Sequence, residues 1–160
     1  MIVRKIMLGT RNLEEYMEKN KIRGEIIHLR PSEARTSISA ARAVGCSLGQ
    51  IAKNILLVGE KNKILVITSG DKKVNLKKVS EIFGGRFRLA TPREILEETG
   101  YGVGGVPPFG HIKEIKTIID PSIKRYSFVY TSGGSEDTLM KIDVDELIRA
   151  CNGEILSVSE

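Results

Sequence analysis

The sequence predicts a mixed α/β fold of the α+β kind, in which helices surround a mainly antiparallel, curved sheet. Two observations predict it. Apolar runs of strand length are interleaved with amphipathic segments that begin at helix-capping residues. Tight turns join so many of these runs that a purely parallel sheet is excluded. A chain of 160 residues can build one core, so we expect a single domain over 1–160, with 1–10 as a peripheral N-terminal extension.

The helix boundaries carry the strongest local signals. The segment Asn12–Glu15 has the pattern of a capping box and opens a first helix that ends before Gly24. Thr91–Glu94 offers a capping Thr, a Pro at the first helical position and a Glu at the third, and this helix ends at Gly100. Further helical segments are expected over 37–44, 48–52, 76–83 and 144–151.

The expected strands are short and apolar. Turn residues such as Glu60–Lys63 and Ser132–Ser135 separate neighbouring runs, which indicates hairpins. No repeat or low-complexity segment interrupts their order. The strands are expected over 25–29, 54–58, 64–68, 117–119, 127–131, 139–142 and 154–158.

The composition indicates a cytoplasmic protein with an anionic partner. The formal net charge is +5 and the cations are not gathered into one block. Apolar runs such as Ile55–Val58 are far too short to span a membrane, and Met1–Thr10 has no convincing signal-peptide cleavage site. Cys46 and Cys151 are isolated, so each is expected to be a small buried residue rather than part of a metal or redox site.

The most informative segment is the glycine-rich run Gly100–Gly110. Closely spaced glycines followed by Pro107 and Pro108 are typical of an ordered loop that brings bare backbone up to a ligand. The run formally contains GxGxxG, but the dinucleotide-binding fingerprint needs a strand before it and a helix after it. Here a helix precedes it and the two prolines prevent a helix from following, so no cofactor is expected.

Side-chain catalysis has few candidates. The histidines are His28 and His111, and no GxSxG nucleophile motif is present. No His, Cys and Asp cluster has the spacing of metal ligands, so no metal is expected. Both histidines are interpreted as satisfied or surface residues, although His111 directly follows the glycine-rich run.

A site built from backbone amides and a cation remains possible. Glycine-rich backbone can offer N–H groups to a carbonyl or a developing oxyanion. Lys53 stands just before the apolar strand 54–58, which would place its ammonium at the mouth of a pocket. From this segment alone, a surface lysine whose stem covers apolar residues is the favoured interpretation.

Three segments together resemble the YbaK family of aminoacyl-tRNA deacylases, also called the prolyl-tRNA synthetase editing-domain family. They occur in the family's order, and the resemblance as a whole covers roughly residues 13–156. They are 40–58 with its lysine, 99–110 with a GxxxP core at Gly104–Pro108, and Thr131–Gly134 followed by a strand and a helix containing Asp145–Ile148.

The resemblance implies an editing-domain fold that hydrolyses the ester joining a wrong amino acid to tRNA, without a cofactor. It implies that Lys53 anchors the 3′-terminal adenosine or orients the ester, and that the amides of Gly104 and Gly105 hold the substrate carbonyl. The partner implied is the aminoacylated end of tRNA, with an aminoacyl-tRNA synthetase as a second partner. The substrate-binding positions implied are Thr36, Pro108, Ser132 and Gly133.

Two departures from the family leave the substrate open. Leu139 stands where the branch that removes cysteine from proline tRNA has an aspartate, and the histidine of the alanine-specific branch has no counterpart after His111. We expect a free-standing enzyme acting on proline tRNA that carries Cys, Ala or a related small amino acid. The alternatives are an inactive tRNA- or synthetase-binding module of the same fold, and a small-molecule-binding domain without nucleic acid.

Overall fold

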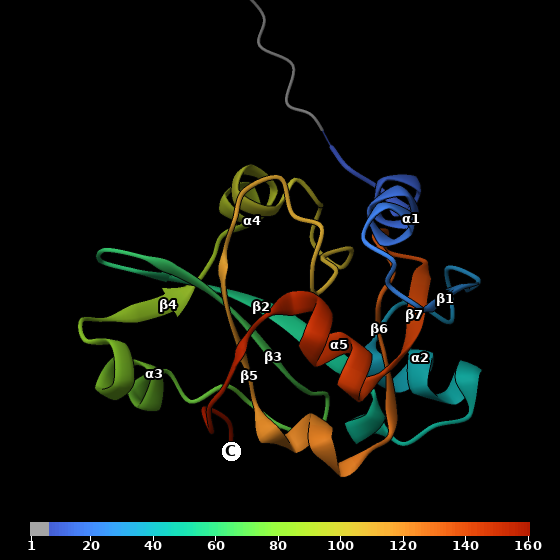
Figure 1. Ribbon diagram of the computed structural model, residues 1–160. Helices are drawn as coiled ribbons and strands as arrows, with labels where there is room; N and C mark the ends of the chain where they lie inside the picture. Colours follow the sequence, from blue (N-terminus) through green and yellow to red (C-terminus); the bar gives the residue numbers. More distant parts are fainter. Residues whose placement is uncertain (1–6) are drawn as a thin grey trace, which may run out of the picture.

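The computed structural model describes residues 7–160. Helices and strands alternate irregularly along the chain, and most connections between them are short (Figure 1). In chain order the elements are α1 (Thr10–Lys19), β1 (Glu25–His28), α2 (Ser37–Val44), η1 (Leu48–Gln50), β2 (Ala52–Gly59), β3 (Lys63–Ser69), α3 (Leu76–Phe83), β4 (Phe87–Leu89), α4 (Pro92–Thr99), β5 (Lys116–Ile119), η2 (Pro121–Arg125), β6 (Phe128–Ser132), β7 (Thr138–Asp143), α5 (Val144–Cys151) and β8 (Glu154–Ile155).

The described strands form two sheets where the sequence predicted one. The smaller sheet has the order β1-β7-β6 and is antiparallel throughout. The larger has the order β4-β2-β3-β5-β8, antiparallel at β4-β2-β3 and parallel at β3-β5-β8. An isolated parallel bridge between Ile51 and Tyr130 joins the two sheets. The predicted class, mixed α/β with mainly antiparallel pairing, is confirmed.

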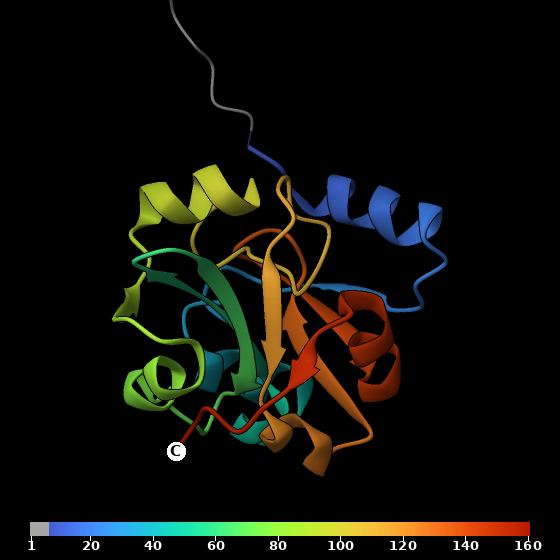
Figure 2. The same cartoon turned by 60° about the vertical axis from the view of Figure 1, so that its left-hand side comes forward.

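The helices lie around the sheets. Helices α1 and α4 lie at one end of the molecule and η2 at the other, as two views show (Figures 1 and 2). Helix α5 buries Leu147 in a cluster with Ile119 and Val129 of β5 and β6. Helix α3 buries Val79 against Leu57 of β2. Apolar faces of both sheets are therefore covered, which stabilises the fold through burial of apolar surface.

Local signals placed the helices well. Helices α2, α3 and α5 have the predicted bounds, and Thr91 caps α4 by accepting a 3.2 Å hydrogen bond from the Glu94 amide. Helix α1 begins at Thr10, before the predicted capping box, because the Asn12 side chain accepts a hydrogen bond from the Gly9 amide one turn earlier. The short elements β4 and η2 were not predicted.

The start of the described chain is hydrogen-bonded to two loops that contain glycines: the loop that begins at Gly100 and the turn between β6 and β7 that contains Gly133. Part of the predicted N-terminal extension, residues 1–6, lies outside the described residues. The Leu8 amide donates to the Gly100 carbonyl at 2.7 Å, and the Thr10 hydroxyl donates to the Gly133 carbonyl at 2.8 Å. Residues 7–160 contain no helix with the length and apolar character needed to cross a bilayer.

Candidate active site

An inner cavity of about 430 Å³ opens beside β2. Strand β4 pairs only with Leu57–Gly59 of β2, and the earlier residues of β2, Ala52–Leu56, line the cavity. The start of α2 and the loop around Gly104 form other parts of the wall. The lining is largely apolar and includes Leu29, Ala40, Ile55, Leu89, Ile95 and Leu139.

An outer cavity of about 750 Å³ adjoins the inner one. Loop residues line it, chiefly Gly102–Gly105 and Gly134–Asp137. Five residues line both cavities and define what we call the neck: Ala34, Arg35, Val103, Gly104 and Glu136. The volumes are in the range of cavities that hold small organic ligands. A ligand with two unequal parts could therefore occupy both cavities at once, with their junction at the neck.

The glycines of the two loops allow close contact between their backbones. A Cβ on Gly105 would lie 3.1 Å from the Gly134 carbonyl oxygen. Gly134 has φ +95°, and a Cβ there would lie 2.9 Å from the Cα of Thr10. Much of the glycine content therefore serves packing between loops and α1, not direct ligand contact. Gly104, with φ +82°, is the exposed glycine of the neck.

The two amides singled out by the sequence differ in availability. The Gly105 amide already donates to the Gly102 carbonyl at 3.0 Å, within a turn. The Gly104 amide has no hydrogen-bond partner within residues 7–160. The Ser132 hydroxyl donates to the Gly104 carbonyl at 2.9 Å, which fixes the following peptide unit, the one that contains the Gly105 amide. One amide, rather than two, is free to meet a ligand in the neck.

Lys53 lines the inner cavity, but its ammonium turns away from the glycine loop. It donates to the Lys72 carbonyl at 2.7 Å, at the end of the larger sheet. Its partner in the β2–β3 ladder, Thr68, bonds to Ser159 on the face covered by the C-terminal segment. Partial burial lowers the pKa of Lys53, and the charge of Asp71 opposes this shift. Lys53 and Gly104 thus line one cavity, and the hydrogen bond of the Lys53 ammonium is made with the Lys72 carbonyl rather than with the glycine loop.

Asn54 occupies the position that faces the loop, and the sequence analysis missed it. Its Nδ2 donates to the Val106 carbonyl at 2.9 Å and to the Thr131 hydroxyl at 2.7 Å. Its Oδ1 is buried and has no partner within the described residues. Alternation along β2 puts Asn54 and Lys53 on opposite faces. The available signal was a lone Asn at the start of an apolar strand, a residue type that is uncommon there.

The other predicted site residues divide between locations. Thr36 and Ser132 line the inner cavity with Lys53 and Gly104. Thr36 also caps α2, where its hydroxyl accepts from the Ser39 amide at 3.0 Å. Gly105 lines the outer cavity, and Gly133 lines neither of the two.

Pro108 is buried and borders a separate cavity of about 690 Å³, together with Tyr16 and His111. The structure does not bring Pro108 to the wall of the inner or the outer cavity.

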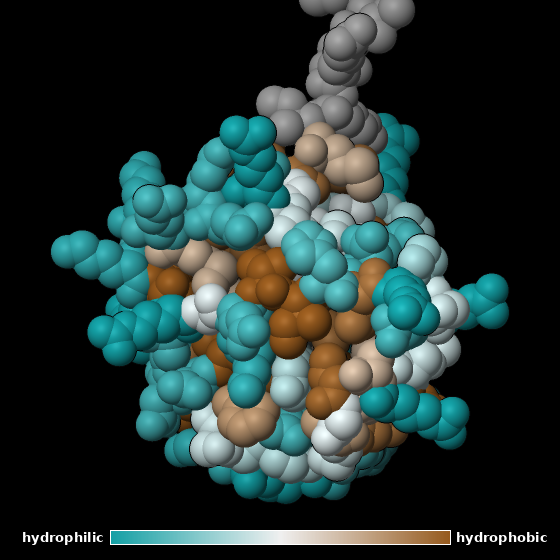
Figure 3. All heavy atoms as spheres, turned by 90° about the vertical axis from the view of Figure 1, so that its right-hand side faces the viewer, coloured by the Kyte–Doolittle hydropathy of each residue, from teal (hydrophilic) through white to brown (hydrophobic). Residues whose placement is uncertain are grey.

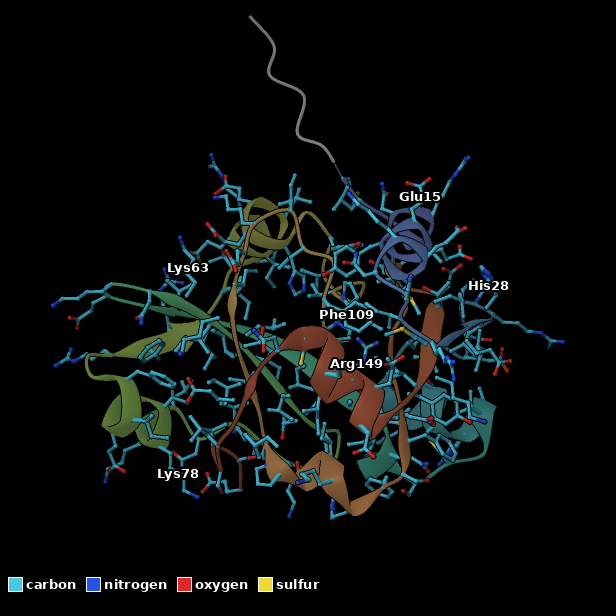
Figure 4. All side chains as sticks on the ribbon, viewed as in Figure 1. Glu15, His28, Lys63, Lys78, Phe109 and Arg149 are labelled. Carbon is cyan, nitrogen blue, oxygen red and sulfur yellow. The ribbon has the colours of Figure 1, made fainter. Side chains whose placement is uncertain are left out.

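The histidines and cysteines lie away from the neck. His28 is exposed at the end of β1, on the outside of the molecule (Figure 4). The Nε2 of His111 lies 2.7 Å from the Pro107 carbonyl oxygen and so carries the proton, and burial lowers the His111 pKa. Burial raises the pKa of both Cys46 and Cys151, which disfavours the thiolate. Within the described residues no group of three His, Cys, Asp or Glu side chains could hold a metal.

Exposed apolar side chains gather at the cavity openings. Met7 lines the outer cavity, Leu89 the inner cavity and Val103 the neck, and each is at least half exposed. The side of the molecule that carries β1 and α2 also presents hydrophobic surface at its centre, enclosed by hydrophilic side chains (Figure 3). Exposed apolar surface of this kind marks a place where another molecule can bind.

The segment that builds this site matches a known family. Residues 31–150 match the family model for the aminoacyl-tRNA editing domain, and they include the residues that line both cavities except Met7–Gly9 and Leu29. The chain belongs to this family. The predicted resemblance is confirmed.

The chain is also similar to individual proteins and to a solved structure. The uncharacterized protein YwhH of Bacillus subtilis (strain 168) is 36% identical over 72% of this chain and 74% of its own length. The multifunctional Ser/Thr-tRNA deacylase ProXp-y of Escherichia coli (strain K12) is 28% identical over 71% of each chain. A solved structure of a proposed trans-editing enzyme for prolyl-tRNA synthetase aligns with a TM-score of 0.88 at 32% identity, and covers 94% of this chain and 96% of that one.

Proposed function

We propose that this protein is a hydrolase that removes a wrong amino acid from mischarged tRNA, acting in trans as a separate deacylase. Membership of the editing-domain family supports this function. The observation that carries it is the unpaired Gly104 amide at the neck, because an N–H group without a partner in the protein can donate to an ester carbonyl and polarise it. The aminoacyl group would occupy the inner cavity and the terminal nucleoside the outer one.

The chemistry needs few side chains. A water molecule adds to the ester carbonyl, negative charge develops on the carbonyl oxygen, and the Gly104 amide stabilises it. The bond from the carbonyl carbon to the ribose oxygen then breaks, and that oxygen takes a proton as the free amino acid leaves. The Oδ1 of Asn54 is a buried acceptor without a partner in the described residues, and a turn of this side chain would let it hold the attacking water or a substrate hydroxyl. In this mechanism the site holds the water molecule and the ester in the orientation needed for attack, so no side chain has to act as the nucleophile.

Lys53 can supply the cation in this proposal. An ammonium has three donors, and the one hydrogen bond that the structure gives it goes to the Lys72 carbonyl. Desolvation without a paired carboxylate destabilises the charged form, which its lowered pKa reflects. An anionic oxygen of the tRNA end, placed beside Lys53, would restore the lost solvation. A rotation of this flexible side chain would bring the ammonium to the substrate.

The inner cavity favours small amino acids. Its volume of about 430 Å³ must also admit the ester and part of the ribose, and Leu139 contributes an apolar wall where a carboxylate was expected for the cysteine branch. Alanine, cysteine, serine and threonine are therefore the candidates. The net charge of +5 supports contact with the tRNA phosphates.

The test is a deacylation screen with Cys-, Ala-, Ser- and Thr-charged tRNAs, including mischarged proline tRNA. We expect at least one to be hydrolysed, and Lys53→Ala to lower the rate by about 100-fold, the usual effect of removing one transition-state contact. Lys72→Ala is the matched control, because it removes a neighbouring ammonium and keeps the carbonyl that holds Lys53.

Two results would contradict the proposal. Failure of the wild-type protein at micromolar concentration to hydrolyse any of these tRNAs, with salt-dependent tRNA binding intact, would favour the inactive binding module. An equal loss of rate in Lys53→Ala and Lys72→Ala would show that Lys53 has no catalytic role distinct from that of a neighbouring lysine.

A further inference from the structure

The neck contains an unpaired carboxylate. Glu136 lies in the turn between β6 and β7, is exposed, and lines both cavities. Its carboxylate makes no hydrogen bond or ion pair within residues 7–160. Arg35 lines the same neck, yet no ion pair joins the two side chains. A carboxylate that makes no ion pair within the described residues is available to a cationic group of a ligand.

Glu136 also lies close to the proposed oxyanion position. A Cβ on Gly104 would stand 3.4 Å from the Cγ of Glu136, so this side chain rests against the peptide that would hold the ester carbonyl. A bare carboxylate there would repel the negative charge that develops during hydrolysis. The arrangement favours catalysis only if the bound substrate brings a positive charge to the carboxylate. In an aminoacyl ester that charge is the α-ammonium, one carbon away from the carbonyl.

The adjacent carboxylate is placed differently. Asp137 accepts a 2.9 Å hydrogen bond from the Ser135 hydroxyl, and it lines the outer cavity but not the inner one. It therefore has a partner in the protein and does not reach the neck. Of these two neighbouring acidic residues, only Glu136 combines an unpaired carboxylate with a position in the neck.

We propose that Glu136 binds the α-ammonium of the aminoacyl ester, so that the enzyme acts on a free α-amino group and rejects esters whose amino group is acylated. This inference rests on the proposed function and specifies its substrate class. It assigns Glu136 a role in substrate recognition at the neck, between the side chain held in the inner cavity and the nucleoside in the outer one. An N-acylated substrate loses the positive charge and leaves the carboxylate unpaired beside the developing oxyanion.

The experiment compares two substrates and three proteins. The substrates are the aminoacyl-tRNA that the wild type hydrolyses fastest and the same tRNA after chemical N-acetylation, each corrected for spontaneous hydrolysis. We expect the wild type to prefer the free amine. Glu136→Gln should lower kcat/KM for the free amine by about 10- to 100-fold, as expected for loss of a charge-assisted hydrogen bond, and leave the N-acetyl rate unchanged or higher. Asp137→Asn, the matched control, should keep the wild-type ratio.

The ratio of the two rates separates recognition from a general structural effect. If Glu136→Gln leaves the ratio of the two rates unchanged, for example because both rates fall equally, the inference is overturned while the deacylase function stands. A wild-type protein that hydrolyses none of the charged tRNAs in the deacylation screen would overturn the proposed function itself, and the inference with it.

Discussion

The inner and outer cavities are built in different ways. The inner cavity, about 430 Å³, is walled largely by apolar side chains of β2, α2 and α4, and by Leu139 of β7. The outer cavity, about 750 Å³, is walled by loop backbone, with Arg35, Glu136 and Asp137 as its charged residues. Regular elements fix the shape of the first, and contacts between loops and α1 fix the second.

This difference suggests a division of work within one site. A rigid apolar cavity discriminates ligands by size, and a hydrophobic pocket gains only modest selectivity for each methylene. A wall of polar backbone and charged side chains instead recognises features that every aminoacyl-tRNA shares, such as the α-ammonium and the phosphate. On the proposed function, the inner cavity therefore selects the amino acid, and the neck and outer cavity recognise the ester and the tRNA end. The following predictions test this division.

The largest effect is expected at the inner cavity. Asn54→Ala removes the unpaired Oδ1 and leaves the Val106 carbonyl and the Thr131 hydroxyl without their donor. Single-turnover deacylation should slow by at least about 100-fold. Denaturant unfolding should show a loss of about 1–3 kcal/mol, the cost of unsatisfied buried polar groups.

Asn62→Ala is the control for Asn54, because Asn62 is exposed in the β2–β3 turn and contributes only its backbone carbonyl to the Gly59 amide. Activity of Asn54→Ala within threefold of the wild type would show that the cavity works without this amide group. The inner cavity would then contribute shape alone.

The second prediction concerns the free energy of unfolding and a glycine in the wall of the outer cavity. Gly134→Ala adds a Cβ 2.9 Å from the Thr10 Cα at a residue with φ +95°. We expect a loss of about 3 kcal/mol from strain and displaced backbone, measured as a lower Tm and a lower denaturant midpoint. The control is Gly45→Ala, which has φ +73° but open space around it, and should cost only about 1 kcal/mol. Equal losses at the two positions would show that loop packing does not define the outer wall.

The smallest effect is a pH dependence of protein stability that comes from His111, which bonds to Pro107 in the glycine-rich loop. Burial holds the His111 pKa below its usual 6.5, while Nε2 donates to the Pro107 carbonyl. Because the unfolded chain binds the proton more readily, the stability supplied by neutral His111 is complete above pH 6.5 and falls as the pH drops toward the native pKa.

His111→Gln should flatten the dependence of unfolding free energy on pH just below 6.5. Urea unfolding at several pH values measures it, with His28→Gln, at an exposed position, as the control. An unchanged slope in His111→Gln would contradict the burial of a neutral imidazole beneath the loop.

Local chemistry made much of the fold predictable. Helix α4 could be placed because Thr91 and Glu94 cap it within one turn, and α2 because Gly45 ends it with φ +73°. Strand β4 is three residues long and pairs only with the end of β2, so no pattern within its own sequence marks it. The division into two sheets depends on contacts distant in sequence, such as the bridge from Ile51 to Tyr130.

The sequence by itself determined the family, the order of the helices and strands other than β4 and η2, and the presence of Lys53 and a glycine-rich loop in one protein. Tertiary structure alone decided which groups meet. It turned Lys53 toward Lys72 and Asn54 toward the loop, engaged the Gly105 amide in a turn, and left Gly104 and Glu136 unpaired at the neck. The physical reason is that helix caps act within a few residues, whereas the face of a strand that borders a cavity depends on packing by distant segments.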